Sequence, residues 1–284
     1  MSGFSFGFST DDVENFDKSD STSGANKQLQ WFPAKELTFD SDPLLPSSYL
    51  HSRGSVQLEI ANSEEVLKLV SENENSCAKA ADSVHSDLVP AFYEGGLKIW
   101  ECTDDLLDFI SRPIFKEKLQ NSKVLDLGCG SGAIGIYCLL SGASEVHFQD
   151  YNEEVLKFYT RPNVTLNLFG DNVTDKVKYF AGDWSSFADL MKNYKYDFIF
   201  TSETIYSQEC YPKLLKIFKN HLNDSGEIYL GAKTYYFGVG GGTRLFESAL
   251  EKEATLKSEQ VWKCDEGLHR EILRITKAIT SLGS

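Results

Sequence analysis

Lys123-Val124-Leu125-Asp126-Leu127-Gly128-Cys129-Gly130-Ser131-Gly132 is the stretch of this sequence that decides the fold. A short apolar run contains one acid, three glycines follow at alternate positions, and an apolar helical pattern begins at Ala133. This order predicts a buried parallel strand, a tight turn and a helix packed on the sheet. Glycines allow the backbone to turn sharply and to approach a ligand, and the helix amino terminus offers unpaired N–H donors.

Two ligand classes use such a turn. A dinucleotide site has the spacing Gly-x-Gly-x-x-Gly, whereas this chain has Gly-x-Gly-x-Gly with Asp126 two residues before Gly128. An acid there is unfavourable beside a pyrophosphate but suits a cationic ligand such as S-adenosylmethionine, which has no phosphate. The pattern favours a methyl-donor site contacted by Asp126, Gly128 and Gly130. A nucleotide site or a plain glycine-rich turn remain alternatives.

Length and charge limit the function classes. The chain has 284 residues and a formal net charge of −14, so we expect one large domain with an appendage and no direct binding to nucleic acid, which needs a basic surface. A basic protein substrate is compatible with this charge, although surface acidity also serves solubility. We expect a monomer.

Composition also bears on the compartment. No segment resembles a signal peptide and no apolar run approaches transmembrane length. The six cysteines form no Cys-x-x-Cys pair, which predicts reduced thiols in the cytoplasm or nucleus and no metal site.

The first part of the chain differs from the rest. Residues 1–28 are rich in Ser, Asp, Asn and Gly, a composition that predicts disorder. Trp31-Phe32-Pro33 begins an irregular arm, followed by a strand at 56–60, a helix at 64–70 and a loop over 71–86. We therefore divide the chain into an extension, 1–86, and a catalytic domain, 87–284.

The catalytic domain alternates strand and helix patterns. After the strand at 123–127, predicted strands lie at 145–150, 177–180, 196–201, 226–232, 257–262 and 270–276. Predicted helices lie at 104–110, from 133 to Gly142, from 153 to 159, at 211–222 and at 246–253. A further predicted helix begins at 186. The last two strands alternate like an antiparallel pair. This gives an α/β fold with seven strands and helices on both faces.

Acids follow three of these strands. Asp150 ends the second and is placed to accept both ribose hydroxyls of an adenosine. Asp183, in Gly182-Asp183-Trp184, could accept from the adenine amino group while Trp184 covers the base; the alternative is an ordinary turn before a helix. Glu203 follows the fourth strand and is a candidate for handling the substrate.

Two segments dense in aromatic residues and glycine flank these motifs. Residues 87–103 precede the first strand and suggest a lid over the ligand, with a packed loop as the alternative. Residues 235–242 follow the fifth strand and are a candidate part of the substrate cleft.

Five motifs together resemble those of the protein-histidine methyltransferases that modify a large-subunit ribosomal protein. They are Tyr93 to Thr103, Val146 to Asn152, Gly182 to Trp184, Thr201 to Tyr206 and Tyr236 to Gly242. The similarity is collinear over 87–276. It implies a Rossmann-like seven-strand class I methyltransferase fold, S-adenosylmethionine as donor, and methylation of a histidine ring nitrogen in ribosomal protein L3.

The resemblance also implies roles for individual residues. Cofactor contacts are expected at Ile99, Trp100, Glu101, Cys102, Thr103, Gly128, Gln149, Asp150, Tyr151, Gly182, Asp183, Trp184 and Ser202. Glu203-Thr204-Ile205-Tyr206 matches an acid-x-x-aromatic signature shared with related lysine methyltransferases, and makes Glu203 and Tyr206 the catalytic candidates.

Histidine chemistry gives Glu203 a specific role. Imidazole has a reference pKa near ~6.5, so its lone pair is largely free at neutral pH. The enzyme must then fix a tautomer, and Glu203 could accept the proton of the non-attacking nitrogen. Alternatively, Glu203 only hydrogen-bonds the local backbone. A lysine methyltransferase and a non-catalytic escort of a ribosomal protein remain alternative functions.

Overall fold

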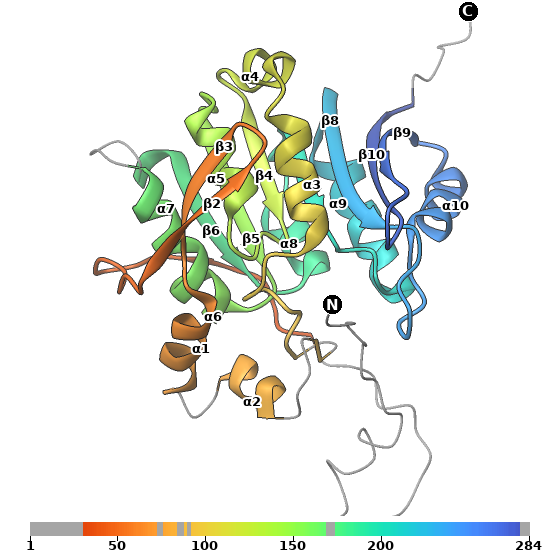
Figure 1. Ribbon diagram of the computed structural model, residues 1–284. Coiled ribbons are helices and arrows are strands. Elements are labelled where there is room, and N and C mark those ends of the chain that lie inside the picture. Colours follow the sequence, from red (N-terminus) through yellow and green to blue (C-terminus); the bar gives the residue numbers. More distant parts are fainter. Residues whose placement is uncertain (1–30, 73–75, 84–87, 90–91, 169–173, 279–284) are drawn as a thin grey trace, which may run out of the picture.

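The structure is a computed structural model that describes residues 31–72, 76–83, 88–89, 92–168 and 174–278. The predictions for residues 1–28 lie outside these ranges. Within the described residues, eight strands form the main sheet in the order β1-β6-β5-β4-β7-β8-β10-β9 (Figure 1). Their bounds are β1 Lys35–Leu37, β4 Lys123–Leu127, β5 Glu145–Asp150, β6 Val177–Ala181, β7 Tyr196–Ser202, β8 Leu222–Lys233, β9 Leu256–Cys264 and β10 Arg270–Lys277.

All seven predicted strands are present, and the methyltransferase-like α/β fold is confirmed. β6, β5, β4, β7 and β8 run parallel, and β10 lies antiparallel between β8 and β9. The strand order reverses between β4 and β7. In an open sheet of this kind the ligand crevice lies at that switch point, beyond the carboxyl ends of the strands.

Helices cover both faces of the sheet (Figure 1). One face carries α3 Glu101–Ile110, α4 Pro113–Leu119, α5 Ala133–Leu140 and α7 Arg161–Asn167, which follows α6 Glu153–Val155 and a π-helical turn at Leu156–Thr160. The other face carries α8 Trp184–Leu190, α9 Tyr211–His221 and α10 Thr243–Glu253. Each face buries its own apolar cluster. No helix within the described ranges is long and apolar enough to span a membrane.

The helix after the glycine turn packs very closely on the sheet. A Cβ added to Gly135 in α5 would lie 2.4 Å from Cε1 of Phe148 on β5. Ile134, Ile136 and Cys138 of the same helix are buried. This close packing fixes the position of the helix amino terminus, and hence of the turn before it.

The amino-terminal region departs from the sequence prediction. β1 pairs antiparallel with β6 as an eighth strand of the main sheet, although the predicted division at residue 87 placed it in the extension. β2 Ser48–Arg53 and β3 Val56–Ala61 form a separate hairpin, of which β2 was not predicted. The helix predicted at 64–70 is confirmed as α1 Ser63–Ser71.

The prediction of a loop over 71–86 was wrong at Cys77–Ser83, which form α2. The backbone N–H of Ala78 donates to the carboxylate of Glu154 at 2.6 Å, and the hydroxyl of Ser76 accepts from Lys79 N at 3.0 Å. Because Glu154 is distant in the sequence, a local pattern could not show that it stabilises the first turn of this helix.

Candidate active site

A single cavity gathers most of the predicted site residues at the carboxyl ends of β4 to β7. It holds about 1080 Å³ of space, its open mouth included. Its walls come from six segments that are distant in the sequence: the arm, the segment 92–103, the glycine turn, and the residues that follow β5, β6 and β7. The predicted residues that line it are Trp100, Thr103, Gly128, Gly130, Asp150, Tyr151, Gly182, Asp183, Trp184, Ser202, Glu203 and Tyr206.

The glycine turn has the sharp geometry that its sequence predicted. Gly128, Gly130 and Gly132 have φ values of 67°, 49° and 74°, which favour glycine. A Cβ on Gly130 would lie 3.0 Å from the carbonyl oxygen of Gly96, and one on Gly128 would lie 2.8 Å from Thr204. The turn thus leaves its backbone open to a ligand while neighbouring segments pack tightly on it.

Asp150 lies at the end of β5 with 4% of its surface exposed. Its two carboxylate oxygens accept from Gly130 N at 3.0 Å and from Asn152 N at 3.1 Å. Burial raises the pKa of Asp150 to about 6, assisted by the nearby charge of Glu94. Each oxygen keeps a second lone pair, so the carboxylate can still accept ribose hydroxyls.

Asp126 does not line the cavity, contrary to the expectation that it meets a cationic ligand. It is buried behind the glycine turn, where one carboxylate oxygen accepts from the N–H of Gly135 at 2.9 Å. Burial raises the pKa of Asp126 to about 8. The acid therefore supports the first turn of α5, because the strand directs its side chain toward the helix and away from the cavity.

The segment after β6 forms the wall at one end of the cavity. Asp183 caps α8 by accepting from Ser185 N at 3.0 Å and pairs with Lys213 Nζ at 2.5 Å. Gln149 lies behind this wall: its side chain accepts from Trp184 Nε1 at 2.8 Å and donates to the carbonyl of Gly182 at 2.8 Å. Gln149 thus orients Trp184, and Asp183 also performs the ordinary capping role considered as its alternative.

The arm before β1 completes that wall, which the sequence analysis missed. Trp31 lines the cavity, and Lys213 Nζ lies 3.2 Å from the centroid of its ring. Phe32 stacks on Tyr151 at 5.4 Å between centroids, and its N–H donates to the Tyr151 hydroxyl at 3.0 Å. Asp183 N donates to the carbonyl of Phe32 at 2.8 Å. The only signal in the sequence was the aromatic pair itself, far from every motif.

The segment 92–103 lies against the opposite side. Glu94 N donates to Asn152 Oδ1 at 3.0 Å, and Trp100 Nε1 donates to the carbonyl of Gly95 at 3.1 Å. The hydroxyls of Thr103 and Ser202 share a hydrogen bond of 2.7 Å. Ile99, Glu101 and Cys102, which the sequence analysis also expected at the cofactor, are not among the residues that line the cavity.

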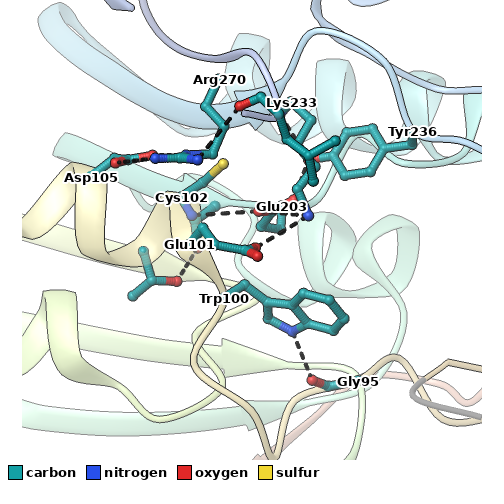
Figure 2. A network of polar contacts seen from close by, with 12 residues as sticks. Gly95, Trp100, Glu101, Cys102, Asp105, Glu203, Lys233, Tyr236 and Arg270 are labelled. Atoms are coloured by element: carbon teal, nitrogen blue, oxygen red, sulfur yellow. Dashed lines mark hydrogen bonds and ion pairs between the residues drawn. The ribbon is translucent and has the colours of Figure 1, made fainter. Parts of the chain in front are cut away.

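Glu203 follows β7 directly and is held in an unusual conformation. Its φ of 58° is rarely adopted by a residue with a side chain. Its carboxylate accepts from the Tyr236 hydroxyl at 2.6 Å and from Cys102 N at 3.4 Å (Figure 2). Lys233 Nζ lies 3.6 Å from Oε1 of the same carboxylate. Two other segments, the start of α3 and the end of β8 with the loop that follows it, therefore converge on this side chain.

Tyr206, the second catalytic candidate, reaches a different acid. Its hydroxyl donates to the carboxylate of Glu94, and burial raises the pKa of Tyr206 well above its ordinary value. Its ring meets that of Tyr236 edge-on at 6.5 Å between centroids. Glu203 and Tyr206 thus share one end of the cavity and are linked through Tyr236. Sequence reasoning missed Lys233, because a lysine near a strand end ordinarily predicts a solvated position.

Comparisons with known proteins agree with this geometry. The family model described as "Lysine methyltransferase" matches residues 92–237. The histidine protein methyltransferase 1 homolog of Dictyostelium discoideum is 46% identical over 198 residues, which cover 68% of this chain and 62% of that protein. The homolog of Mus musculus is 39% identical over 295 residues, covering 92% of this chain and 79% of that protein.

Solved structures agree in fold. SMU.776, a methyltransferase complexed with SAH, has a TM-score of 0.51 at 12% identity, covering 83% of this chain and 57% of that chain. At this identity the likeness concerns the fold alone. The sequence matches carry the assignment further: the chain belongs to the S-adenosylmethionine-dependent methyltransferase family that includes the histidine protein methyltransferase 1 homologs.

Proposed function

We propose that this protein transfers a methyl group from S-adenosylmethionine to a ring nitrogen of a histidine in a basic protein, and that this protein is ribosomal protein L3. The observation that carries the proposal is the position of the Glu203 carboxylate. It lies in the same cavity as Asp150 and the glycine turn, beside the rings of Tyr206 and Tyr236. The names of the relatives support histidine as the acceptor.

The residues of the cavity fit the cofactor. Asp150 offers a buried carboxylate for the ribose, Trp184 offers a ring oriented by Gln149 for the base, and the positive-φ turn at Gly128 and Gly130 leaves the backbone open to the ligand. When bound there, S-adenosylmethionine supplies an electrophilic methyl group on its sulfonium. The protein contributes alignment and exclusion of water, which dominate a displacement of this kind.

The acceptor end suits an imidazole. A neutral imidazole attacks through one nitrogen and carries its proton on the other, so the enzyme needs a proton acceptor at a fixed place. Glu203 keeps lone pairs beyond those used by Tyr236 and Cys102. It can therefore hold the tautomer and stabilise the positive charge that develops on the ring.

One observation favours a second candidate function. The family model is described as "Lysine methyltransferase", and the acid-x-x-aromatic signature of Glu203 and Tyr206 is shared with lysine methyltransferases. A lysine acceptor would need to lose a proton before attack, since its reference pKa is ~10.4. Product analysis separates the two candidates.

The deciding experiment is mass spectrometry of ribosomal proteins from cells with and without this protein. We expect one methylhistidine in L3 to disappear when the protein is removed and to return with the wild-type chain, but not with Glu203→Gln. In vitro, the full chain with S-adenosylmethionine and purified L3 should give methylhistidine on acid hydrolysis. Methyllysine as the only product would establish the second candidate, and an unmodified L3 in both cell lines would exclude the named substrate.

We also propose that the protein acts as a monomer in the cytoplasm and nucleus and does not bind nucleic acid directly. The net charge of −14 supports the last point. All six cysteines, which lie within the described ranges, are free thiols, in keeping with reducing compartments. Each statement has its own test. Light scattering measures the oligomeric state, imaging of the tagged chain shows the compartment, and a filter-binding assay with ribosomal RNA measures binding to nucleic acid.

A further inference from the structure

A lysine side chain lines the acceptor end of the cavity. Lys233 ends β8, and only 4% of its side chain is exposed. Lysine is rarely buried to this degree unless it is paired. It lies beside Glu203, where the proposed function places the substrate side chain. It can therefore act on the substrate as well as stabilise the strand.

Two carboxylates hold this ammonium group. Lys233 Nζ lies 3.2 Å from Oε2 of Glu101 and 3.6 Å from Oε1 of Glu203 (Figure 2). Burial lowers the pKa of Lys233, but the charges of Glu203 and Glu101 outweigh it, so that the net pKa is raised. Lys233 is therefore a cation at neutral pH.

Two aromatic rings also lie near this ammonium group. Lys233 Nζ lies 5.5 Å from the ring centroid of Trp100 and 5.8 Å from that of Tyr236. Carboxylates combined with the faces of aromatic rings are the features that bind an alkylammonium ligand. Here the chain's own side chain occupies these features. Lys98 Nζ, 4.6 Å from the Trp100 centroid, adds a second cation at the same ring.

This arrangement treats the two candidate acceptors differently. At pH 7 only about one lysine side chain in 2,500 is uncharged, whereas about three quarters of histidine side chains are neutral, by their reference pKa values. A substrate ammonium would meet a like charge and find its carboxylate and ring partners taken. A neutral imidazole meets neither obstacle, and its N–H still finds the carboxylate of Glu203.

We propose that Lys233 fills an ammonium subsite within the acceptor end of the cavity, and thereby selects a neutral imidazole over an alkylammonium group. Lys233 is then a specificity-determining residue for the acceptor. The inference rests on the proposed function. It goes further because it names the side chain that distinguishes a histidine acceptor from a lysine acceptor, in a site whose signature residues, Glu203 and Tyr206, are common to histidine and lysine methyltransferases.

The test measures binding and does not depend on turnover. The full chain, loaded with S-adenosylhomocysteine, is titrated at pH 8 with imidazole and separately with n-butylamine, which is protonated there. The Trp100 indole N–H resonance reports occupancy. The variants are Lys233→Met, which keeps most of the length of the side chain but removes its charge, and Lys233→Arg, which keeps the charge. Lys219→Met, which removes an exposed cation on α9 that pairs with Glu253 of α10, is the matched control.

We expect wild type to bind imidazole at least tenfold more tightly than n-butylamine. Lys233→Met should reduce this ratio at least tenfold, while Lys233→Arg and Lys219→Met keep a ratio close to that of wild type. An unchanged ratio in folded Lys233→Met overturns the proposal. If Lys233→Met does not fold, the titrations of wild type still test the proposal, because equal affinity of wild type for imidazole and n-butylamine overturns it.

A second readout separates this inference from the proposed function. Two peptides that span the modified segment of L3, identical except for His or Lys at the acceptor position, are offered to wild type and to Lys233→Met. We expect the variant to gain relative activity on the lysine peptide by at least tenfold. If wild type methylates the histidine peptide but Lys233→Met gains no relative activity on the lysine peptide, only the role of Lys233 is refuted. If wild type methylates neither peptide, the proposed function is refuted.

Discussion

The hydroxyl of Tyr236 donates a hydrogen bond of 2.6 Å to Oε2 of Glu203. The two residues come from different loops, one after β7 and one after β8. Glu203 also has its backbone in the left-handed region, with its N–H bonded to the carbonyl of Gly231 at 2.9 Å. Such a conformation costs roughly 1–3 kcal/mol and persists only where the surroundings enforce it. The acid is therefore held in one orientation, facing the cavity.

The first prediction concerns this acid. Glu203→Gln keeps the shape and an oxygen that can accept from Tyr236, but removes the charge. Because positive charge develops on the acceptor ring, the lost interaction should lower the single-turnover rate by roughly 10- to 100-fold, the equivalent of about 1.5–3 kcal/mol. Affinity for S-adenosylmethionine should change little, since this role faces the substrate.

Single-turnover rates and calorimetric cofactor affinities measure both quantities. Glu209→Gln, at an exposed acid just before α9, is the matched control and should behave as wild type. A glutamine variant at position 203 that transfers methyl at the wild-type rate would show that Glu203 is structural. Tyr206 with its partner Glu94 would then become the candidate for setting the tautomer.

The second prediction concerns the ribose. Asp150→Ala removes the buried acceptor at the end of β5 and should weaken S-adenosylmethionine binding by roughly 1.5–3 kcal/mol, the range for hydrogen bonds to a charged group. Calorimetry on a variant whose circular dichroism matches wild type measures the loss. Asp126→Ala is the informative comparison: its carboxylate contacts Gly135 behind the turn, so its main effect should be on melting temperature. Equal affinities of Asp150→Ala and wild type would exclude the ribose role.

The sequence predicted those parts of the site that depend on local pattern. Asp150 and Glu203 follow apolar strand patterns, and the glycine spacing indicated a turn that does have positive φ at all three glycines. Asp126 lies on β4, the strand that leads into the turn, but its side-chain direction depends on how α5 packs, and no local pattern contains that information. Lys233 was missed for the same reason, since its partners Glu101 and Glu203 come from two other segments.

The arm shows the same limit at the level of the fold. Only three residues, Lys35–Leu37, pair with β6, too few for a period-two pattern to be recognised. Phe32 and Trp31 gain their role from Tyr151 and Lys213, which are distant in the chain. Because of these tertiary contacts, the arm lies at the cofactor end of the cavity, although its composition resembles that of a linker.

The third prediction follows from the arm. Deleting residues 1–28 should leave cofactor affinity and melting temperature nearly unchanged, as their composition suggests. Deleting residues 1–37 should lower both, because it removes β1, the Phe32–Tyr151 stack and the Trp31 wall. Calorimetry and thermal unfolding compare the two truncations. Phe32→Ala in the full chain is the point-mutation counterpart and should weaken cofactor binding in the same direction. Identical affinities for both truncations would show that the arm is not part of the cofactor site.

The fourth prediction concerns pH and rests on Asp150. Burial raises the pKa of this carboxyl to about 6, above the reference value near ~3.9. The ionised form is the better acceptor for ribose hydroxyls, so cofactor affinity should fall as pH drops through about 6. The loss can reach about tenfold for each unit of pH below that value. Folding stability responds in the opposite sense, because a raised pKa favours the protonated folded state: the contribution of Asp150 is full below about pH 4 and is lost as pH rises through about 6.

Calorimetric titration with S-adenosylmethionine between pH 5 and 8 measures the effect, and Asp150→Asn isolates it. The variant cannot ionise at this position, yet it retains Glu94 and Asp126, the two other acids whose charges interact with that of Asp150. The difference between the two affinity profiles therefore belongs to Asp150. We expect wild type to lose affinity toward pH 5 and the weaker-binding variant to show a flatter profile. If both profiles fall in parallel, another acid controls the pH dependence, and Glu94, which accepts from Tyr206, is the side chain to replace next.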